Sequence, residues 1–486
     1  MKLSGLVSGT GWILSGQVAT RLSGMLTAVI IARILGPKGL GELSLIRDIG
    51  VITVPIFTFG VSQAVVRAIS RANRKEAHPE EMSSLFGTLL AIMIGACLVG
   101  FILMVVASPY IARFYRIESM VHLVRLMAIL MFVSVPYELI NAVLTGLEQF
   151  KAFAVREVIS AFLSPIVIYL CVSKWGVAGA IISSGVVNFF LLCLLGRYLL
   201  HSVWPLKVPL GRPSYAIFKN LFAISLPLLG SILLMRPLNL IGSSALVLHA
   251  GLLELGWFRV AYTIYGLTMV VPSALQIPLL PLLSKMGDAD SIRGQGVKIA
   301  RLSMILGMPF FVVGILLAGP ATTMLFGKAF EAAKGVVALM LIVGFIAVIV
   351  SILETNIISQ GKTFQQFKVN IINIAVFVIA VYIFVPLFAH WGLALAYLIT
   401  EFVALFIYGY IFVRSSKIDF VRLSQPTAVS VLMIFLSLWC ASLDMGYFFG
   451  GIKFLLLLPA TMLTYYLMDN HERGTLRRYL KLPRIA

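Results

Sequence analysis

The sequence predicts an all-α polytopic membrane protein with about fourteen transmembrane helices, and three observations support this fold class. Hydrophobic residues make up 60% of the 486 residues, and charged residues make up only 12%. In soluble domains about 45–50% of the residues are hydrophobic and about 25% are charged. The mean hydropathy is +1.02. Apolar runs long enough to cross about 30 Å of hydrocarbon recur along the whole chain.

The expected spans follow one another through mostly short connections, and no soluble domain is inserted between them. Each span is an apolar segment bounded by charged or turn-forming residues. In chain order they are 8–35, 41–70, 83–108, 119–146, 154–174, 177–200, 217–247, 253–281, 298–319, 335–358, 369–388, 392–413, 427–443 and 451–468.

Lysine and arginine gather in alternate connections, with 25 on one side of the membrane and 8 on the other. Because positive residues favour the cytoplasmic side, we expect both termini in the cytoplasm and the chain in the plasma (inner) membrane. This distribution accounts for the net charge of +19 without a nucleic-acid partner. The first apolar segment is too long for a cleavable signal peptide and contains Arg21, so it is expected to be a span.

The two halves of the chain resemble each other at an offset of 215–216 residues. The matched pairs are Trp175 with Trp391, Glu138 with Glu354, Arg21 with Arg236 and Gly41 with Gly256. Six spans in each half give both halves the same orientation. We therefore expect two pseudo-symmetric six-helix bundles, 1–205 and 206–416, related by an axis along the membrane normal, followed by a helix pair and a basic tail in 417–486.

Five arginines lie within otherwise apolar spans, and four of them carry the argument: Arg21, Arg47, Arg236 and Arg259. An arginine at the centre of a span costs about 2.5–3.5 kcal/mol, so it usually faces a wet cavity or a partner. On a helical wheel each lies on a face of small and polar residues. The neighbours expected to line the same cavity are Gln17, Ser44, Thr58, Asn239 and Tyr262. The pattern indicates a cationic central cavity that receives an anion. Alternatively, each arginine reaches the interface or neutralises a buried carboxylate such as Asp48.

Few carboxylates lie in or near the spans: Asp48, Glu138, Glu157, Glu354 and Glu401. A membrane-buried carboxylate can couple transport to Na⁺ or H⁺, and Asp48, Glu138, Glu354 and Glu401 are the candidates. The competing interpretation is an intramembrane ion pair, such as Asp48 with Arg47. The four cysteines lie in apolar segments and the six histidines are dispersed, so no metal site, catalytic residue or cofactor is expected.

Three motifs carry a resemblance to a known family: residues 31–41 (Ile-Ala-Arg-Ile-Leu-Gly-Pro-Lys-Gly-Leu-Gly), Gly146 with Phe150-Lys151, and residues 175–180 (Trp-Gly-Val-Ala-Gly-Ala). The chain resembles the polysaccharide-exporter branch of the multidrug/oligosaccharidyl-lipid/polysaccharide exporter superfamily. The resemblance implies two bundles facing a V-shaped cavity whose basic residues receive a pyrophosphate. Arg21, Arg47 and Arg259 lie on spans where such flippases place cavity arginines. It further implies, from the lipid II flippases, a lipid-tail groove formed by spans 13 and 14.

The expected function is a flippase, and not an enzyme, that moves a polyprenyl-(pyro)phosphate-linked oligosaccharide to the outer leaflet by alternating access. Its expected partners are this substrate, membrane lipids and glycan-assembly enzymes. A lipid II flippase and an ion-coupled multidrug exporter are the alternatives, although an exporter of organic cations would need an acidic cavity. A membrane glycosyl-transfer enzyme would need a sizeable outer loop with paired carboxylates or histidines, and the outer loops here are short.

Overall fold

The computed structural model describes residues 3–58, 60–74, 79–199, 211–235, 237–268 and 289–415, and all regular elements within these ranges are helical. The expected spans 427–443 and 451–468, together with Arg236, lie outside the described residues. The prediction of fourteen spans therefore stays a prediction. Six described helices are long and apolar enough to cross a membrane, and they coincide with α3, α4, α5, α10, α11 and α12, bounded below.

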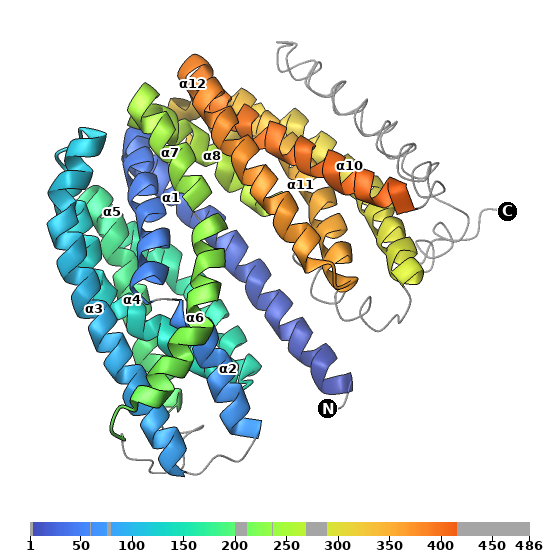
Figure 1. The fold of residues 1–486 in the computed structure, drawn as a ribbon. Helices are drawn as coiled ribbons and strands as arrows, with labels where there is room; N and C mark the ends of the chain where they lie inside the picture. The colour runs from blue at the N-terminus through green and yellow to red at the C-terminus, as the bar shows by residue number, and fades with distance from the viewer. Residues whose placement is uncertain are drawn as a thin grey trace. The chain divides into compact units, whose positions relative to one another are not determined.

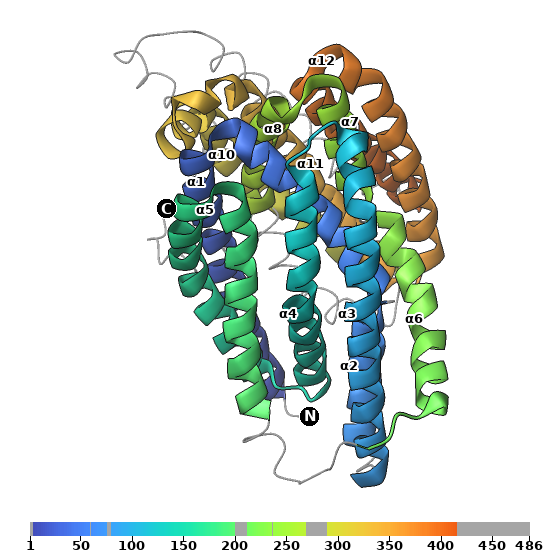
Figure 2. The same ribbon diagram turned by 90° about the vertical axis from the view of Figure 1, so that its left-hand side faces the viewer.

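The chain divides into two compact units, Met1–Gly256 and Trp257–Ala486. The first unit contains α1 (Leu3–Phe57), α2 (Val61–Arg74), α3 (Pro79–Tyr115), α4 (Met120–Gly146), α5 (Phe150–Tyr198), α6 (Tyr215–Met235), α7 (Pro237–Ala250) and the first residues of α8 (Leu252–Thr268). The second contains the rest of α8, α10 (Ala289–Phe326), the 3₁₀ helix η2 (Lys328–Ala333), α11 (Lys334–Ser359) and α12 (Thr363–Ser415). Figures 1 and 2 show the helices. The predicted bundles 1–205 and 206–416 have a different boundary and stay a prediction.

Three of the long helices are each two helices joined by a sharp turn. The turns lie at Gly36, Gly176 and Ala389, where φ is +66°, +56° and +49°. Glycine adopts such left-handed angles readily, whereas alanine is strained there. α1, α5 and α12 thus contain the successive span pairs that hydropathy predicts around these turns.

The turns in α5 and α12 match each other at a different register from the one the sequence motif suggests. A β-carbon at Gly179 would collide with the carbonyl oxygen of Cys171, and one at Gly392 would collide with that of Phe384. Gly179 and Gly392, which make these equivalent contacts, are 213 residues apart. The sequence match of Trp175 with Trp391 has an offset of 216 residues. The prediction that Trp175 and Trp391 occupy equivalent positions is therefore wrong by three residues. Close approach of two helices at a glycine sets the register here, and an exposed tryptophan does not.

A second pair of glycines shows the repeat more directly. A β-carbon at Gly41 would overlap the carbonyl oxygen of Leu252, and one at Gly256 would overlap that of Pro37. At an offset of 215 residues, Gly41 corresponds to Gly256 and Pro37 corresponds to Leu252. Exchanging the members of each pair turns the first contact into the second. Such a reciprocal contact is what a local two-fold relation produces. The crossing of α1 and α8 therefore supports the internal repeat through the pair that the sequence singled out.

The second expected span is broken near its middle, between α1 and α2. Pro55 has no N–H, and Gly60 has a φ of +62°. The backbone N–H and the hydroxyl of Thr58 both donate to Val54 O, at 3.0 and 2.9 Å, and this closes the end of α1. α2 then continues with one buried face, formed by Val61, Ala64, Val65 and Ile69.

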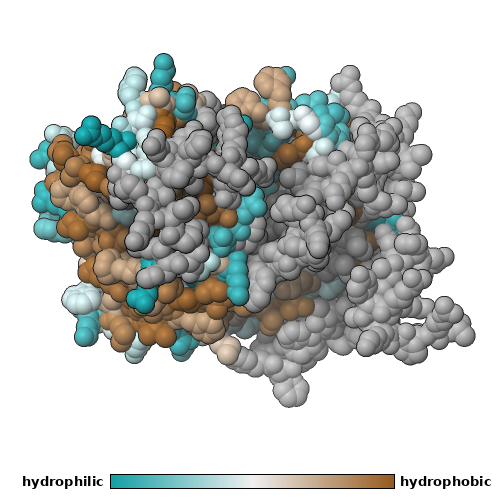
Figure 3. Space-filling view, turned by 90° about the horizontal axis from the view of Figure 1, so that it is seen from below, coloured by the Kyte–Doolittle hydropathy of each residue, from teal (hydrophilic) through white to brown (hydrophobic). Residues whose placement is uncertain are grey.

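In the second unit, α11 packs against α10 and α12 (Figure 1). Most of its residues are buried, as expected for a helix that is hydrophobic on all sides. On the outer helices, large apolar side chains are exposed, including Phe162 at 73% and Phe406 at 75%. Figure 3 shows hydrophobic side chains over much of the described surface on the face in view. The exposed phenylalanines on the outer helices match a lipid-facing role.

Candidate functional site

Arg21 lies on an exposed side of the first half of α1. Two hydrogen bonds fix the opposite side of this helix to α5. The hydroxyl of Thr20 donates to Glu157 Oε2 at 2.5 Å, and that of Ser23 donates to the carbonyl oxygen of Ala161 at 2.6 Å. At Gly24 a β-carbon would have no neighbour within 4 Å. Within the first unit, Arg21 and Gly24 thus face open space.

Arg47 is exposed on the second half of α1, whereas the adjacent Asp48 is buried. The hydroxyl of Ser243 on α7 donates to Asp48 Oδ2 at 2.6 Å. Ser44 is 3% exposed and donates to Leu40 O at 2.6 Å. The carboxylate of Asp48 therefore holds α7 against α1, and the guanidinium of Arg47 lies toward the surface of the unit.

Arg259 belongs to the second unit and lies beside an aromatic cluster. Its guanidinium carbon is 5.4 Å from the ring centroid of Tyr262, a distance at which a cation is attracted by the ring. The ring of Tyr262 lies 5.8 Å from that of Tyr397 and 6.0 Å from that of Phe258. These contacts stiffen the surroundings of Arg259 while its side chain stays partly exposed.

The predicted cationic residues therefore belong to different units of the chain. Arg21 and Arg47 are exposed on α1, Arg259 is partly exposed on α8, and Arg236 lies outside the described residues. Asn239 is partly buried on α7, and the side chain of Gln17 is not among those described. A single cavity shared by the four arginines stays a prediction.

Thr58 and Glu138, which sequence reasoning assigned to different roles, come together in the first unit. The hydroxyl of Ser62 on α2 donates to Glu138 Oε2 on α4 at 3.4 Å. Both predicted residues line a small pocket of about 20 Å³ beside the break between α1 and α2. The pocket is otherwise lined mainly by apolar side chains of α2, α3 and α4. Glu138 is thus a carboxylate with open space beside it.

Glu354 and Glu401 lie close enough in the second unit for their charges to interact. Glu354 accepts a hydrogen bond from Gln366 Nε2 at 2.6 Å. Tyr408, 1% exposed, lies within electrostatic range of both carboxylates, and its hydroxyl has no hydrogen-bond partner in the described structure. The second unit thus contains two carboxylates and an unsatisfied hydroxyl among largely apolar helices. No group of three or more His, Cys, Asp or Glu side chains in the described ranges could hold a metal ion.

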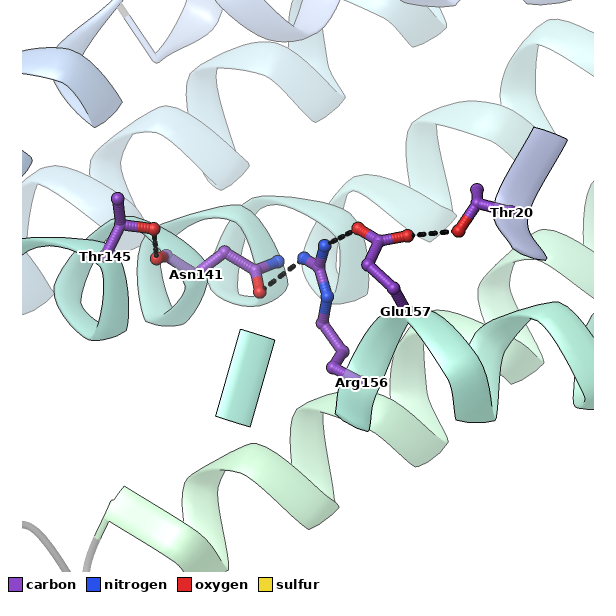
Figure 4. A network of polar contacts seen from close by, with 5 residues as sticks. All are labelled: Thr20, Asn141, Thr145, Arg156 and Glu157. Atoms are coloured by element: carbon purple, nitrogen blue, oxygen red, sulfur yellow. Dashed lines mark hydrogen bonds and ion pairs between the residues drawn. The ribbon is translucent and has the colours of Figure 1, made fainter. Parts of the chain in front are cut away.

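Sequence reasoning missed a buried arginine. The distribution of positive residues predicts Arg156 on the cytoplasmic side, but the structure buries it at 9% exposure. It forms an ion pair with Glu157 and donates from Nη1 to Asn141 Oδ1 at 2.6 Å (Figure 4). Adjacent residues on a helix do not usually face each other, so the sequence did not suggest this pair. An arginine one turn inside a span beside a carboxylate was the available signal.

Comparisons with known proteins identify the family. Residues 30–335 match the family described as "Polysaccharide biosynthesis protein". The capsular polysaccharide biosynthesis protein CapF of Staphylococcus aureus is 24% identical over 423 residues, which cover 84% of this chain and all of that protein.

Solved structures show the same fold. The inward closed conformation of the lipid II flippase MurJ has a TM-score of 0.74 at 14% identity, over 97% of this chain and 100% of that chain. An inward-facing multidrug resistance MATE transporter has a TM-score of 0.67 at 17% identity, over 85% and 95%. Both structural neighbours are transporters, and at these identities the likeness shows the fold alone. The chain therefore belongs to the polysaccharide biosynthesis protein family and is a multi-pass membrane protein with the fold of the multidrug/oligosaccharidyl-lipid/polysaccharide exporter superfamily.

Proposed function

We propose that the protein is a flippase that carries a polyprenyl-(pyro)phosphate-linked oligosaccharide from the cytoplasmic to the outer leaflet by alternating access. The observation that carries this proposal is the exposure of Arg21 and Arg47 on α1 in otherwise apolar spans. Family membership supports the proposed substrate class, because the family is that of polysaccharide biosynthesis proteins. An exporter of organic cations would gain nothing from exposed guanidinium groups.

The chemistry of the substrate fits these residues. Its sugar headgroup is too polar to cross hydrocarbon unaided, its phosphate linker is anionic, and its lipid tail can stay in the bilayer. A guanidinium group presents a planar fork of donors that binds two phosphate oxygens and keeps its charge when partly desolvated. Arg21 and Arg47 are the proposed phosphate-binding residues of the first unit, and Arg259 and Arg236 are further candidates.

An ion gradient is the proposed energy source, with Na⁺ or H⁺ as the coupling ion. Glu354 and Glu401 are the strongest candidates because they lie near each other and near the unsatisfied hydroxyl of Tyr408. Glu138 follows, since it lines a pocket. Asp48 is the weakest candidate, because Ser243 already binds its carboxylate.

Complementation of a flippase-deficient strain tests the proposal. Arg21→Ala should abolish growth while the protein stays inserted and abundant. Arg21→Lys should restore growth partly, because lysine keeps the positive charge but lacks the planar pair of guanidinium donors. The matched control is Arg113→Ala, an exposed arginine at the end of α3, which should complement fully. Full activity of Arg21→Ala at normal abundance would remove the main support for a phosphate site.

A further inference from the structure

The buried polar network around Arg156 is not expected to touch the transported substrate. It joins three helices: Thr20 on α1, Asn141 on α4, and Arg156 with Glu157 on α5 (Figure 4). An ion pair inside a membrane protein is a weak source of stability, because desolvation of both charges offsets their attraction. Its geometry therefore points to a role in orientation.

Arg156 holds Glu157 in a fixed place. One terminal nitrogen of the guanidinium binds Glu157 Oε1, and the other donates to Asn141. The guanidinium carbon lies 4.3 Å from the ring centroid of Phe153 and 5.9 Å from that of Tyr137. Held by hydrogen bonds and rings, Arg156 leaves Oε2 of Glu157 directed at α1, where it accepts the hydrogen bond from Thr20.

The contact with Thr20 sets the rotation of α1 about its own axis. Successive residues of a helix differ by about 100°, so Thr20 and Ser23 fall on one side, and both donate hydrogen bonds to α5. Thr27, whose hydroxyl is buried, continues the same line. The direction of Arg21 then differs from the middle of this line by about 130°. Arg21 cannot turn toward α5 without breaking both hydrogen bonds.

We propose that Glu157, held by Arg156, is a positioning residue that fixes the rotation of α1 and thereby directs Arg21 away from α5 toward the substrate phosphate. The inference rests on the proposed function for the role of Arg21. The orientation itself can be measured without substrate.

The test uses two single-cysteine reporters in a background without the four native cysteines. Gly24→Cys reports the open side of α1, and Thr27→Cys reports the side that faces α5. A water-soluble maleimide should modify Gly24→Cys at least about tenfold faster, because Gly24 is exposed and the Thr27 hydroxyl is buried. Adding Thr20→Val with Ser23→Ala should bring the two rates close together. Thr20→Ser, which keeps the hydroxyl, should preserve the difference.

A second variant tests Glu157 without leaving a lone buried charge. Arg156→Leu with Glu157→Leu replaces the whole pair by apolar side chains, a change that often leaves stability nearly unchanged. It removes the acceptor for Thr20, so the two labelling rates should again converge. If both altered proteins are folded and keep the original difference in rate, the positioning role is refuted.

Transport separates the inference from the proposed function. Transport is measured in reconstituted vesicles containing a polyprenyl-diphosphate-linked oligosaccharide. Thr20→Val with Ser23→Ala should raise the apparent KM about tenfold with little change in kcat. This factor corresponds to the loss of one hydrogen bond from the misdirected Arg21 to the charged phosphate. A purely structural role would lower abundance and leave the labelling ratio unchanged, which would overturn the inference. If the labelling rates converge while Arg21→Ala transports normally, the positioning stands and the phosphate role of Arg21 fails.

Discussion

Replacing Gly41 by alanine perturbs the close approach of α1 and α8. An added β-carbon would overlap the carbonyl oxygen of Leu252 and lie 3.0 Å from the backbone nitrogen of Gly256. Because both obstacles are backbone atoms, no side-chain rotation can relieve the overlap. Overpacking of this kind costs about 1–3 kcal/mol, which outweighs the gain of about 0.5–1 kcal/mol when alanine replaces glycine in a helix.

The matched control is Gly95→Ala on α3, where a β-carbon has no neighbour within 4 Å. Thermal unfolding of the purified proteins in one detergent should show a lower Tm for Gly41→Ala and an unchanged or higher Tm for Gly95→Ala. Gly256→Ala should lower the Tm much as Gly41→Ala does. The double variant should lower the Tm by less than the sum of the two single losses, because both residues act at one crossing. Equal Tm values for Gly41→Ala and Gly95→Ala would refute the close approach.

Three further predictions concern side chains within the helical units. Phe330→Ala in η2 should destabilise the protein by about 3–5 kcal/mol, because Phe330 is fully buried; an unchanged Tm would contradict its packing. Ser243→Ala should lower the Tm measurably because Asp48 loses its 2.6 Å donor, whereas Ser243→Thr, which keeps the hydroxyl, should lower it less; equal losses would argue against the bond. Glu401→Gln should abolish transport driven by a Na⁺ or H⁺ gradient yet leave passive exchange of lipid-linked substrate; gradient-driven transport at the original rate would exclude Glu401 as the coupling group.

Hydropathy predicted much of the helical fold. The span expected at 335–358 is α11, Lys334–Ser359, and the span expected at 119–146 is α4, Met120–Gly146. Long apolar runs report membrane crossings well because every backbone polar group must be satisfied inside the segment. The turn at Gly36 also falls where the sequence ends one span and begins the next.

Features that depend on contacts between helices were not predicted. The break at 58–60 within the second span interrupts no apolar run, so hydropathy does not detect it. The register of the repeat at Gly179 and Gly392 is set by approach to a carbonyl oxygen, which similarity of sequence around a tryptophan cannot show. The burial of Arg156 depends on Asn141 and Phe153 being brought beside it.

The candidate site was predicted in part. Sequence reasoning identified Arg21 as a charge within a span, and the structure places it on an exposed side of α1. It did not identify Thr20 and Ser23 as the residues that orient this helix, because serine and threonine are common in membrane helices and their partners lie about 137 positions away. Local composition therefore indicated the charge, and only the fold indicates its direction.

The most direct test of the account measures transbilayer movement of a polyprenyl-diphosphate-linked oligosaccharide in vesicles containing the purified protein. The fraction of headgroups exposed outside is followed with an impermeant sugar-binding or sugar-oxidising reagent. The account predicts movement with the native protein, little with Arg21→Ala or Arg47→Ala, native rates with Arg113→Ala, and no competition by organic cations. Equal movement in native and Arg21→Ala vesicles, or movement blocked by organic cations, would contradict an anionic lipid-linked cargo received by exposed arginines.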